Sequence, residues 1–177
     1  MVAPEFSRPE RIDTIGERAR RVTIEATPDE RAALAQRFGL AALGALSADF
    51  EVRREAAGIT ATGQVRGAVT QHCVVTGDPV PAVIDEMVAL RFVPEDQLGA
   101  GEEIEIEGDA LDTIGYAGGA IDLGEAAAET LALALDPFPR SPAAAQALRD
   151  AGVLSEEEAA EARSPFAALK GLGTVRR

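Results

Sequence analysis

The sequence predicts an α+β fold: an antiparallel β-sheet with a long central hairpin, one N-terminal helix and several C-terminal helices. In four stretches between residues 20 and 94, apolar and polar side chains alternate, which is typical of strands with one buried face. From residue 122 onward the apolar residues recur at a helical spacing instead. Strands that come first in a chain and helices that follow indicate the α+β class.

The first predicted elements are a short strand and a helix. Residues 20–26 alternate and predict the strand. Thr27 is placed to cap the helix that follows, with Pro28 at its first position and Glu30 completing a capping box. Gly39 is expected to end this helix, because glycine readily adopts the left-handed backbone that terminates helices.

The clearest strand pattern is a hairpin preceded by another strand. Residues 46–56 alternate first, and residues 59–75 then carry apolar side chains on odd positions and polar ones on even positions. Residues 82–93 return as a second alternating strand, and residues 76–79 (TGDP) have the composition of a turn. Gly63 and Gly67 fall on the buried face and predict a bend or a close backbone approach.

Helices are predicted in the last third of the chain. Asp122, followed by Glu125, begins the first one, and Asp136-Pro137 is expected to end it. A second short helix should run from Ser141 to Gly152, and further helical turns should start at residues 155 and 164. We therefore expect an N-terminal arm (1–19), an α+β domain (20–152) and a C-terminal helical tail (153–177).

The net charge of −13 is concentrated in one part of the chain. Residues 95–161 contain seventeen acidic residues, with Arg140 and Arg149 as their only basic residues. Such a region attracts basic partners and repels phosphate backbones, although the same charges can serve solubility alone. The predicted acidic partner surface consists of Glu102, Glu103, Glu105, Glu107 and Asp109.

Arginines near the N-terminus and in the predicted strands form the opposite candidate. Arg18, Arg20 and Arg21 lie close together in the sequence, and folding could add further arginines to them. The predicted binding residues are Arg20, Arg21, Arg66, Arg91, Arg140 and Phe166, the last as an anchor of the C-terminal tail to the domain or to a partner. Few aromatic residues are present to stack on bases, so these arginines can equally be read as solvated surface residues.

Little in the sequence indicates catalysis. Cys73 is the only cysteine and His72 the only histidine. Neighbouring residues of a strand point to opposite sides, so the two cannot form a nucleophile–base pair, and Cys73 is expected to pack as a small apolar residue. The acids of residues 103–107 would follow one strand face at a spacing that suits solvent better than one metal ion. We expect no catalytic residue, metal, cofactor or small-molecule substrate; a hydrolase with paired carboxylates is the weaker alternative.

The sequence also bears on location. It contains no apolar run long enough to span a membrane and no apolar stretch near its start that resembles a secretory signal. We therefore expect a cytoplasmic protein that does not bind membranes.

Three stretches together carry a resemblance to a known family. They are a cysteine-containing strand with its return strand (69–94), a helix that ends in Asp-Pro-Phe-Pro-Arg (131–140), and Ser-Pro-Phe-Ala-Ala-Leu-Lys (164–170). Their order and spacing resemble the YceD (DUF177) family, most closely its proteobacterial branch. The resemblance implies a non-enzymatic role in accumulation of the large-subunit ribosomal RNA (rRNA).

The resemblance also implies partners and raises the question of zinc. Family genes often neighbour the gene for the basic ribosomal protein bL32, so the implied partner is a ribosomal protein such as bL32, or the rRNA itself. Many relatives carry a second cysteine near the first and a distal pair. Here Thr76 follows Cys73, and residues 136–139 (DPFP) stand where the distal cysteines are expected. We therefore predict no metal, and we expect the acidic region to hold a basic ribosomal protein; direct rRNA binding through the arginines is the alternative.

Overall fold

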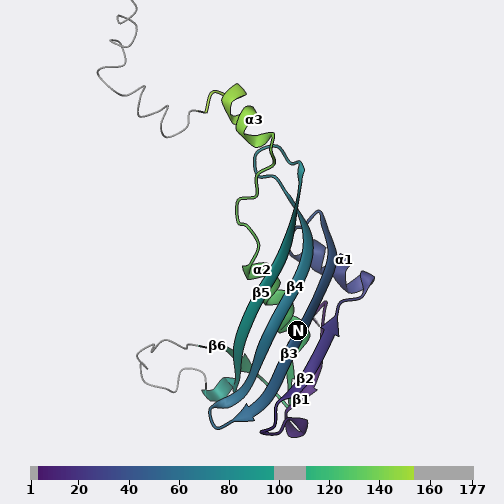
Figure 1. The fold of residues 1–177 in the computed structure, drawn as a ribbon, viewed down its shortest axis with the longest axis vertical. Coiled ribbons are helices and arrows are strands. Elements are labelled where there is room, and N and C mark those ends of the chain that lie inside the picture. Colours follow the sequence, from purple (N-terminus) through teal and green to yellow (C-terminus); the bar gives the residue numbers. More distant parts are fainter. Residues whose placement is uncertain (1–3, 98–110, 154–177) are drawn as a thin grey trace, which may run out of the picture.

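The computed structural model describes residues 4–97 and 111–153, which form a mixed α+β fold (Figure 1). Its main sheet has the strand order β2 (Arg20–Glu25), β3 (Ala42–Glu55), β4 (Gly58–His72), β5 (Pro79–Pro94) and β6 (Asp112–Tyr116). Strands β2 to β5 are antiparallel neighbours, whereas β6 runs parallel to β5, so the predicted antiparallel sheet is mostly but not wholly correct. A second sheet pairs β1 (Pro9–Arg11) with β7 (Ala120–Asp122).

The long hairpin is confirmed. Strands β4 and β5 pair from Ile59 opposite Phe92 to His72 opposite Pro79, and the turn between them includes Gly77 at a φ of 77°. The predicted first strand was too long, since β4 ends at His72 and the chain turns from Cys73 onward.

Three α-helices occur in the described ranges: α1 (Pro28–Arg37), α2 (Leu123–Leu133) and α3 (Ala144–Asp150). Two short 3-10 helices, η1 (Ile12–Thr14) and η2 (Glu95–Gln97), accompany them. Strands β1 and β2 precede α1, so it is not the first element of the chain. The helical turns predicted from residues 155 and 164 lie outside the described residues.

Local sequence signals set the starts of the two longer helices. Thr27 caps α1 in a capping box with Glu30, and the Asp122 carboxylate accepts the backbone N–H groups of Gly124 and Glu125 at the start of α2. Helix α2 ends at Leu133, ahead of the Asp136-Pro137 pair that was expected to stop it.

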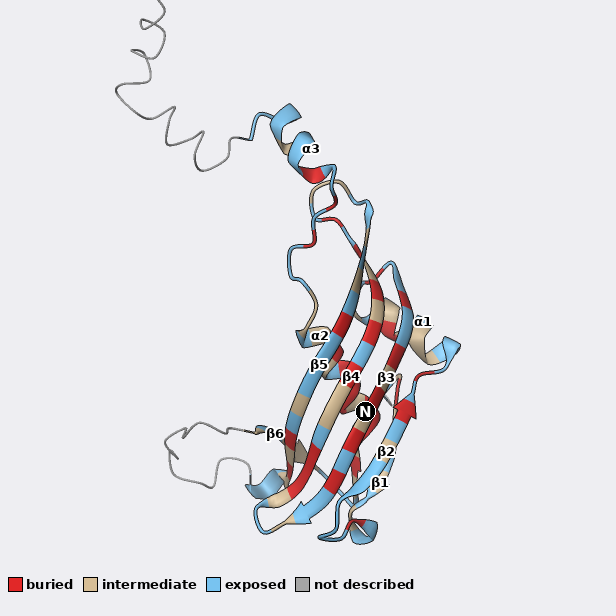
Figure 2. Ribbon diagram, viewed as in Figure 1, coloured by how far each residue is buried: buried red, intermediate tan, exposed pale blue. Residues whose placement is uncertain are grey.

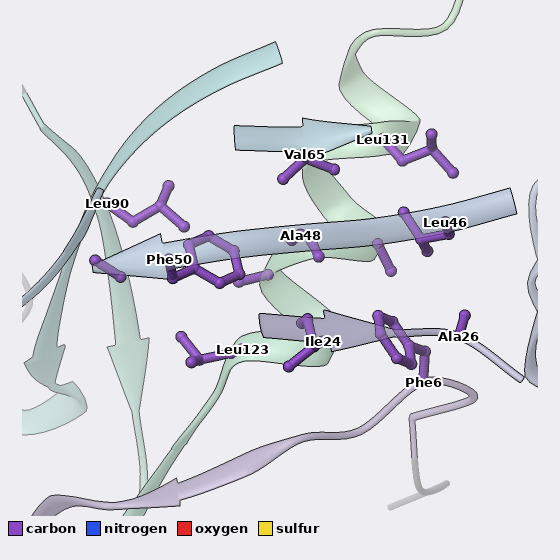
Figure 3. Packing of buried hydrophobic residues seen from close by; sticks show 14 of the residues in the cluster. Phe6, Ile24, Ala26, Leu46, Ala48, Phe50, Val65, Leu90, Leu123 and Leu131 are labelled. Carbon is purple, nitrogen blue, oxygen red and sulfur yellow. The ribbon is translucent and has the colours of Figure 1, made fainter. Parts of the chain in front are cut away.

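One face of the main sheet carries the core. Helix α1 packs on β3 and α2 packs across β4 and β5, and buried residues alternate with more exposed ones along most of β3 and β4 (Figure 2). Figure 3 shows Phe50 of β3, Ile24 of β2 and Leu123 of α2 converging there. The alternation therefore arises because α1 and α2 cover only one face.

The N-terminal segment contributes to this core. Phe6 is fully buried, and burying a phenylalanine stabilises a fold by about 1.5–3 kcal/mol (Figure 3). A Cβ added at Gly124 would lie 2.5 Å from the Phe6 carbonyl oxygen, so the segment runs directly against the start of α2. Residues 4–19 thus pack on the sheet–helix body, and the division into arm, domain and tail stays a prediction.

Candidate functional site

The second face of the main sheet is not covered by any described element. Its side chains come from the positions that alternate with the core, and most are polar. They surround a shallow hollow of about 560 Å³ on β2 to β5. Its lining includes Arg21, Asp49, Thr62, Gly63, Arg66 and Met87. A Cβ at Gly63 would overlap the Asp49 carbonyl oxygen, so glycine permits the close approach of β3 and β4 here, as predicted.

Arg21 and Arg66 come together in this hollow around one carboxylate. Asp49 Oδ1 lies 3.1 Å from Arg21 Nη2, and Asp49 Oδ2 lies 3.4 Å from Arg66 Nη1. Thr23 Oγ1 donates a 2.6 Å hydrogen bond to Asp49, and this bond, together with Arg21, holds the pKa of the Asp49 carboxyl below its usual range. Asp49 therefore stays ionised near neutral pH and offsets the two positive charges.

The other predicted arginines are divided by the fold. Arg20 lies on the opposite face of β2 from Arg21, where it pairs with Glu10 at 2.5 Å. Arg91 of β5 shares the uncovered face with Arg66, whereas Arg140 is exposed in the loop after α2. The structure thus groups Arg21, Arg66 and Arg91 on one face and separates Arg20 and Arg140 from them.

Negative charge accompanies these arginines on the uncovered face. By strand register, four arginines of β2 to β5 face this side together with five acids. The arginines are Arg21, Arg53, Arg66 and Arg91, and the acids are Glu25, Asp49, Glu51, Glu55 and Asp85. Within the described part of these strands, the face is of mixed charge and carries no continuous basic groove.

The acidic character of the second half is visible at several described positions. No lysine, arginine or histidine occurs between Arg91 and Arg140. Five acids of this stretch are exposed: Glu95, Asp96, Asp112, Glu129 and Asp136. The five acids predicted as the partner surface, Glu102 to Asp109, lie outside the described residues, as does Phe166.

A compact polar cluster joins the tip of the hairpin to the loop after α2. The Cys73 sulfur accepts backbone N–H groups from Thr76 at 3.4 Å and from Ser141 at 3.2 Å. The Asp78 carboxylate accepts hydrogen bonds from the Thr76 hydroxyl at 2.7 Å and the Ser141 hydroxyl at 3.2 Å. The cluster therefore fixes residues separated by more than sixty positions in the sequence.

Cys73 has a larger role than the apolar packing expected from the sequence. Burial alone would raise the pKa of its thiol, but the N–H groups of Ser141 and Thr76 lower that pKa to about 6. The turn composition after Cys73 was the only sequence signal for this arrangement. His72 is exposed and its Nδ1 lies 3.5 Å from the Gly77 carbonyl oxygen, so it does not face the Cys73 sulfur.

Neither a metal-binding cluster nor a membrane-spanning helix occurs in the described residues. Within residues 4–97 and 111–153, no three His, Cys, Asp or Glu side chains gather closely enough to hold a metal ion. Among the helices of the same ranges, none has the length and apolarity needed to cross a membrane.

The fold and these surfaces define a small acidic α+β protein with one uncovered sheet face and a fixed hairpin tip. A family model described as large ribosomal RNA subunit accumulation protein YceD matches residues 61–173, which is more than half of the chain. The chain therefore belongs to the YceD family, as its sequence motifs predicted, and its role lies in large-subunit rRNA accumulation. Neither the curated proteins nor the solved structures contain a match to it.

Proposed function

We propose that this protein supports accumulation of the large-subunit rRNA by binding a basic ribosomal protein through the acidic second half of its chain. The observation that carries the proposal is the charge distribution: twelve acids and no basic residue lie between Arg91 and Arg140. A surface of one sign attracts partners of the other sign and speeds their association. Ribosomal proteins that bind rRNA are cationic, so such a surface can hold one of them before it reaches the RNA.

Exposure of the described acids supports this proposal. Glu95, Asp96 and Asp112 flank the predicted acidic partner surface on both sides, and all three are exposed. No ion pair involves them among the described residues. Their charges are therefore available to a partner, and bL32 is the first candidate because of the family resemblance.

Direct rRNA binding is the second candidate, favoured by the meeting of Arg21 and Arg66 in one hollow. Asp49 lies between the two guanidinium groups, and Glu51 and Asp85 share the same face. A phosphate backbone on this face would meet carboxylates as well as arginines, which weakens the electrostatic attraction that RNA binding requires. The acidic-partner proposal is therefore the stronger one.

The test uses the purified full chain, a set of basic large-subunit ribosomal proteins including bL32, and a large-subunit rRNA fragment. We expect at least one ribosomal protein to bind, with an affinity that falls as salt is raised, because counterions screen exposed charges. We expect the rRNA fragment to bind more weakly at every salt concentration. Binding of rRNA alone, lost on changing Arg21 and Arg66 to glutamine, would instead support the second candidate.

A further inference from the structure

The outer edge of β5 has no partner strand along most of its length among the described residues. Strand β4 pairs with one edge of β5 from Pro79 to Phe92, whereas β6 pairs with the other edge only from Leu90 to Pro94 (Figure 1). Among the described residues, no strand pairs with the backbone N–H and C=O groups of residues 79–89 at this border of the sheet, which we call the β5 edge. Such an edge is a template on which another extended chain can add as a strand.

The β5 edge has few of the features that protect a sheet edge from strand addition. Proteins usually blunt exposed edges with proline, charged side chains (lysine above all), bulges or very short strands. Pro79 and Pro81 stand at the start of β5, but residues 82–89 (AVIDEMVA) contain no proline and no lysine. The pairing of these residues with β4 is also regular, without a bulge. An added strand would thus find a regular backbone along residues 82–89.

Exposed apolar side chains border the β5 edge on both faces of the sheet. Val83 and Met87 are 82% and 76% exposed on the uncovered face, and Leu133 at the end of α2 is 88% exposed on the other side. A hollow of about 320 Å³ between β5 and α2 includes Leu133 and Val88 in its lining. Side chains from both faces of an added strand would therefore meet apolar surface.

The charge of the β5 edge determines which kind of added strand it can bind. Asp85 and Glu86 are exposed in the middle of the β5 edge, and Asp112 lines the hollow beside it. Asp85 Oδ1 lies 3.8 Å from Nε of Arg66, its partner residue on β4, whereas no ion pair involves Glu86 or Asp112 among the described residues. Two copies of the chain joined edge to edge in antiparallel fashion would bring like charges together, which destabilises a strand pair. Asp85 and Glu86 point to opposite faces of the sheet, so the lysines or arginines of an alternating strand, which all lie on one face, can lie beside Glu86 and Asp112. The other side chains of that strand then lie beside the exposed apolar side chains of the uncovered face.

We propose that the β5 edge is the docking site for an extended cationic segment of the partner, in which basic residues alternate with β-branched ones. This inference rests on the proposed function, because it states how the basic ribosomal protein is held. Backbone hydrogen bonds to residues 82–89 supply the affinity. Val83 and Met87 select the β-branched side chains on one face of the added strand, and Glu86 selects the basic side chains on its other face.

The test uses the full chain and a short peptide in which lysine alternates with valine or threonine. A peptide of the same composition with two central prolines is the control, because proline cannot complete a strand ladder. Amide hydrogen exchange locates the bound peptide, and fluorescence anisotropy measures its affinity. We expect binding of the first peptide only, with slowed exchange within residues 82–89.

Two variants with the same charge change separate the β5 edge from the face as a whole. Met87→Lys and Thr62→Lys each add a lysine at an exposed position of the uncovered face, but Thr62 lies on β4, whose backbone is paired on both sides. We expect Met87→Lys to weaken peptide binding by at least about fivefold, and Thr62→Lys by less than about twofold. Val83→Lys repeats the test at a second edge position.

Several outcomes would overturn the inference. One is an equal loss of peptide affinity in Met87→Lys and Thr62→Lys. Others are peptide protection of amides outside residues 82–89 only, and slow amide exchange within residues 82–89 before any peptide is added. The last is a dimer of this chain that Met87→Lys dissociates. The inference and the proposed function fail separately. Peptide binding at the β5 edge with no ribosomal protein bound refutes only the proposed function. A bound ribosomal protein that is indifferent to Met87→Lys refutes only the inference.

Discussion

The contact between Leu131 of α2 and Gly67 of β4 allows a quantitative test of how this helix packs on the sheet. Leu131 is fully buried, and a Cβ added at Gly67 would overlap its Cδ1 atom. Leu131→Ala should cost about 3 kcal/mol of unfolding free energy, within the roughly 2–5 kcal/mol range for such core truncations. Gly67→Ala should cost about 1–2 kcal/mol, because it overpacks the same place.

The two changes together should cost less than their sum. In the double variant, the methyl group that Gly67→Ala adds would occupy part of the cavity that Leu131→Ala leaves. We expect a coupling free energy of about 1–2 kcal/mol in favour of the double variant, beyond the roughly 0.5 kcal/mol scatter of additive pairs.

Urea unfolding of the four proteins, followed by circular dichroism, measures this coupling. Leu133→Ala, two residues along the same helix but 88% exposed, is the matched control and should change the unfolding free energy by less than about 0.5 kcal/mol. Strict additivity of Leu131→Ala and Gly67→Ala would refute the packing of α2 on β4 described above, as would an equal loss of stability from Leu133→Ala.

Three further perturbations test other parts of the fold. Phe6→Ala should lower the unfolding free energy by about 3–4 kcal/mol in urea titrations because the side chain is fully buried, whereas an arm free of the body would lose almost nothing. The hydrogen-bonded Arg8 guanidinium holds the pKa of Glu30 at about 2, below its ordinary 4.5. That ion pair should contribute at most about 2 kcal/mol to the free energy of unfolding. The contribution should be present above pH 4.5 and lost as the pH falls toward 2. Urea titrations at each pH should therefore show that the unchanged chain loses its stability advantage over Glu30→Gln across that window. The thiolate absorbance of Cys73 in the native chain should rise with pH, with a midpoint near pH 6. In denaturant this midpoint should shift toward the ordinary pKa of 9.0. A native midpoint above about pH 8 would contradict the two N–H···S contacts.

The hairpin could be predicted from the sequence because burial of one sheet face leaves a period-two pattern. Odd residues of β4, such as Val65 and Val69, are buried, while Thr62 and Arg66 are exposed. The starts of α1 and α2 could also be predicted, because Thr27 and Asp122 cap these helices through groups only two or three residues away. These features depend on short-range chemistry that a single sequence contains.

The strands that were missed depend on distant partners. Strand β1 has three residues, and its pairing with β7 joins positions more than one hundred residues apart. Residues 112–116 (DTIGY) show no clear alternation, and β6 is a strand because it pairs with the end of β5. Short strands with a half-exposed pattern carry little signal of their own, so tertiary pairing decides them.

The candidate sites were predicted unevenly for the same reason. Arg20 and Arg21 are neighbours in the sequence, and the alternation of strand residues sends them to opposite faces, which could have been inferred from the predicted strand itself. The meeting of Arg21 with Arg66 around Asp49 required the register of three strands. The contact of Cys73 with Ser141 required the path of the loop after α2, which no local pattern determines.

Affinity for a basic ribosomal protein, compared between two charge-matched variants, tests the central claim most directly. The first variant changes Glu102, Glu103, Glu105 and Glu107 to glutamine. The second changes Glu17, Glu25 and Glu51 to glutamine and Asp29 to asparagine, all exposed residues of the first half. Both remove four negative charges, so net charge alone affects them equally. We expect the first variant to bind bL32, or the ribosomal protein that binds tightest, at least about tenfold more weakly than the second at low salt. Equal affinity of the two variants, or no binding of any basic ribosomal protein to the unchanged chain, would contradict the account.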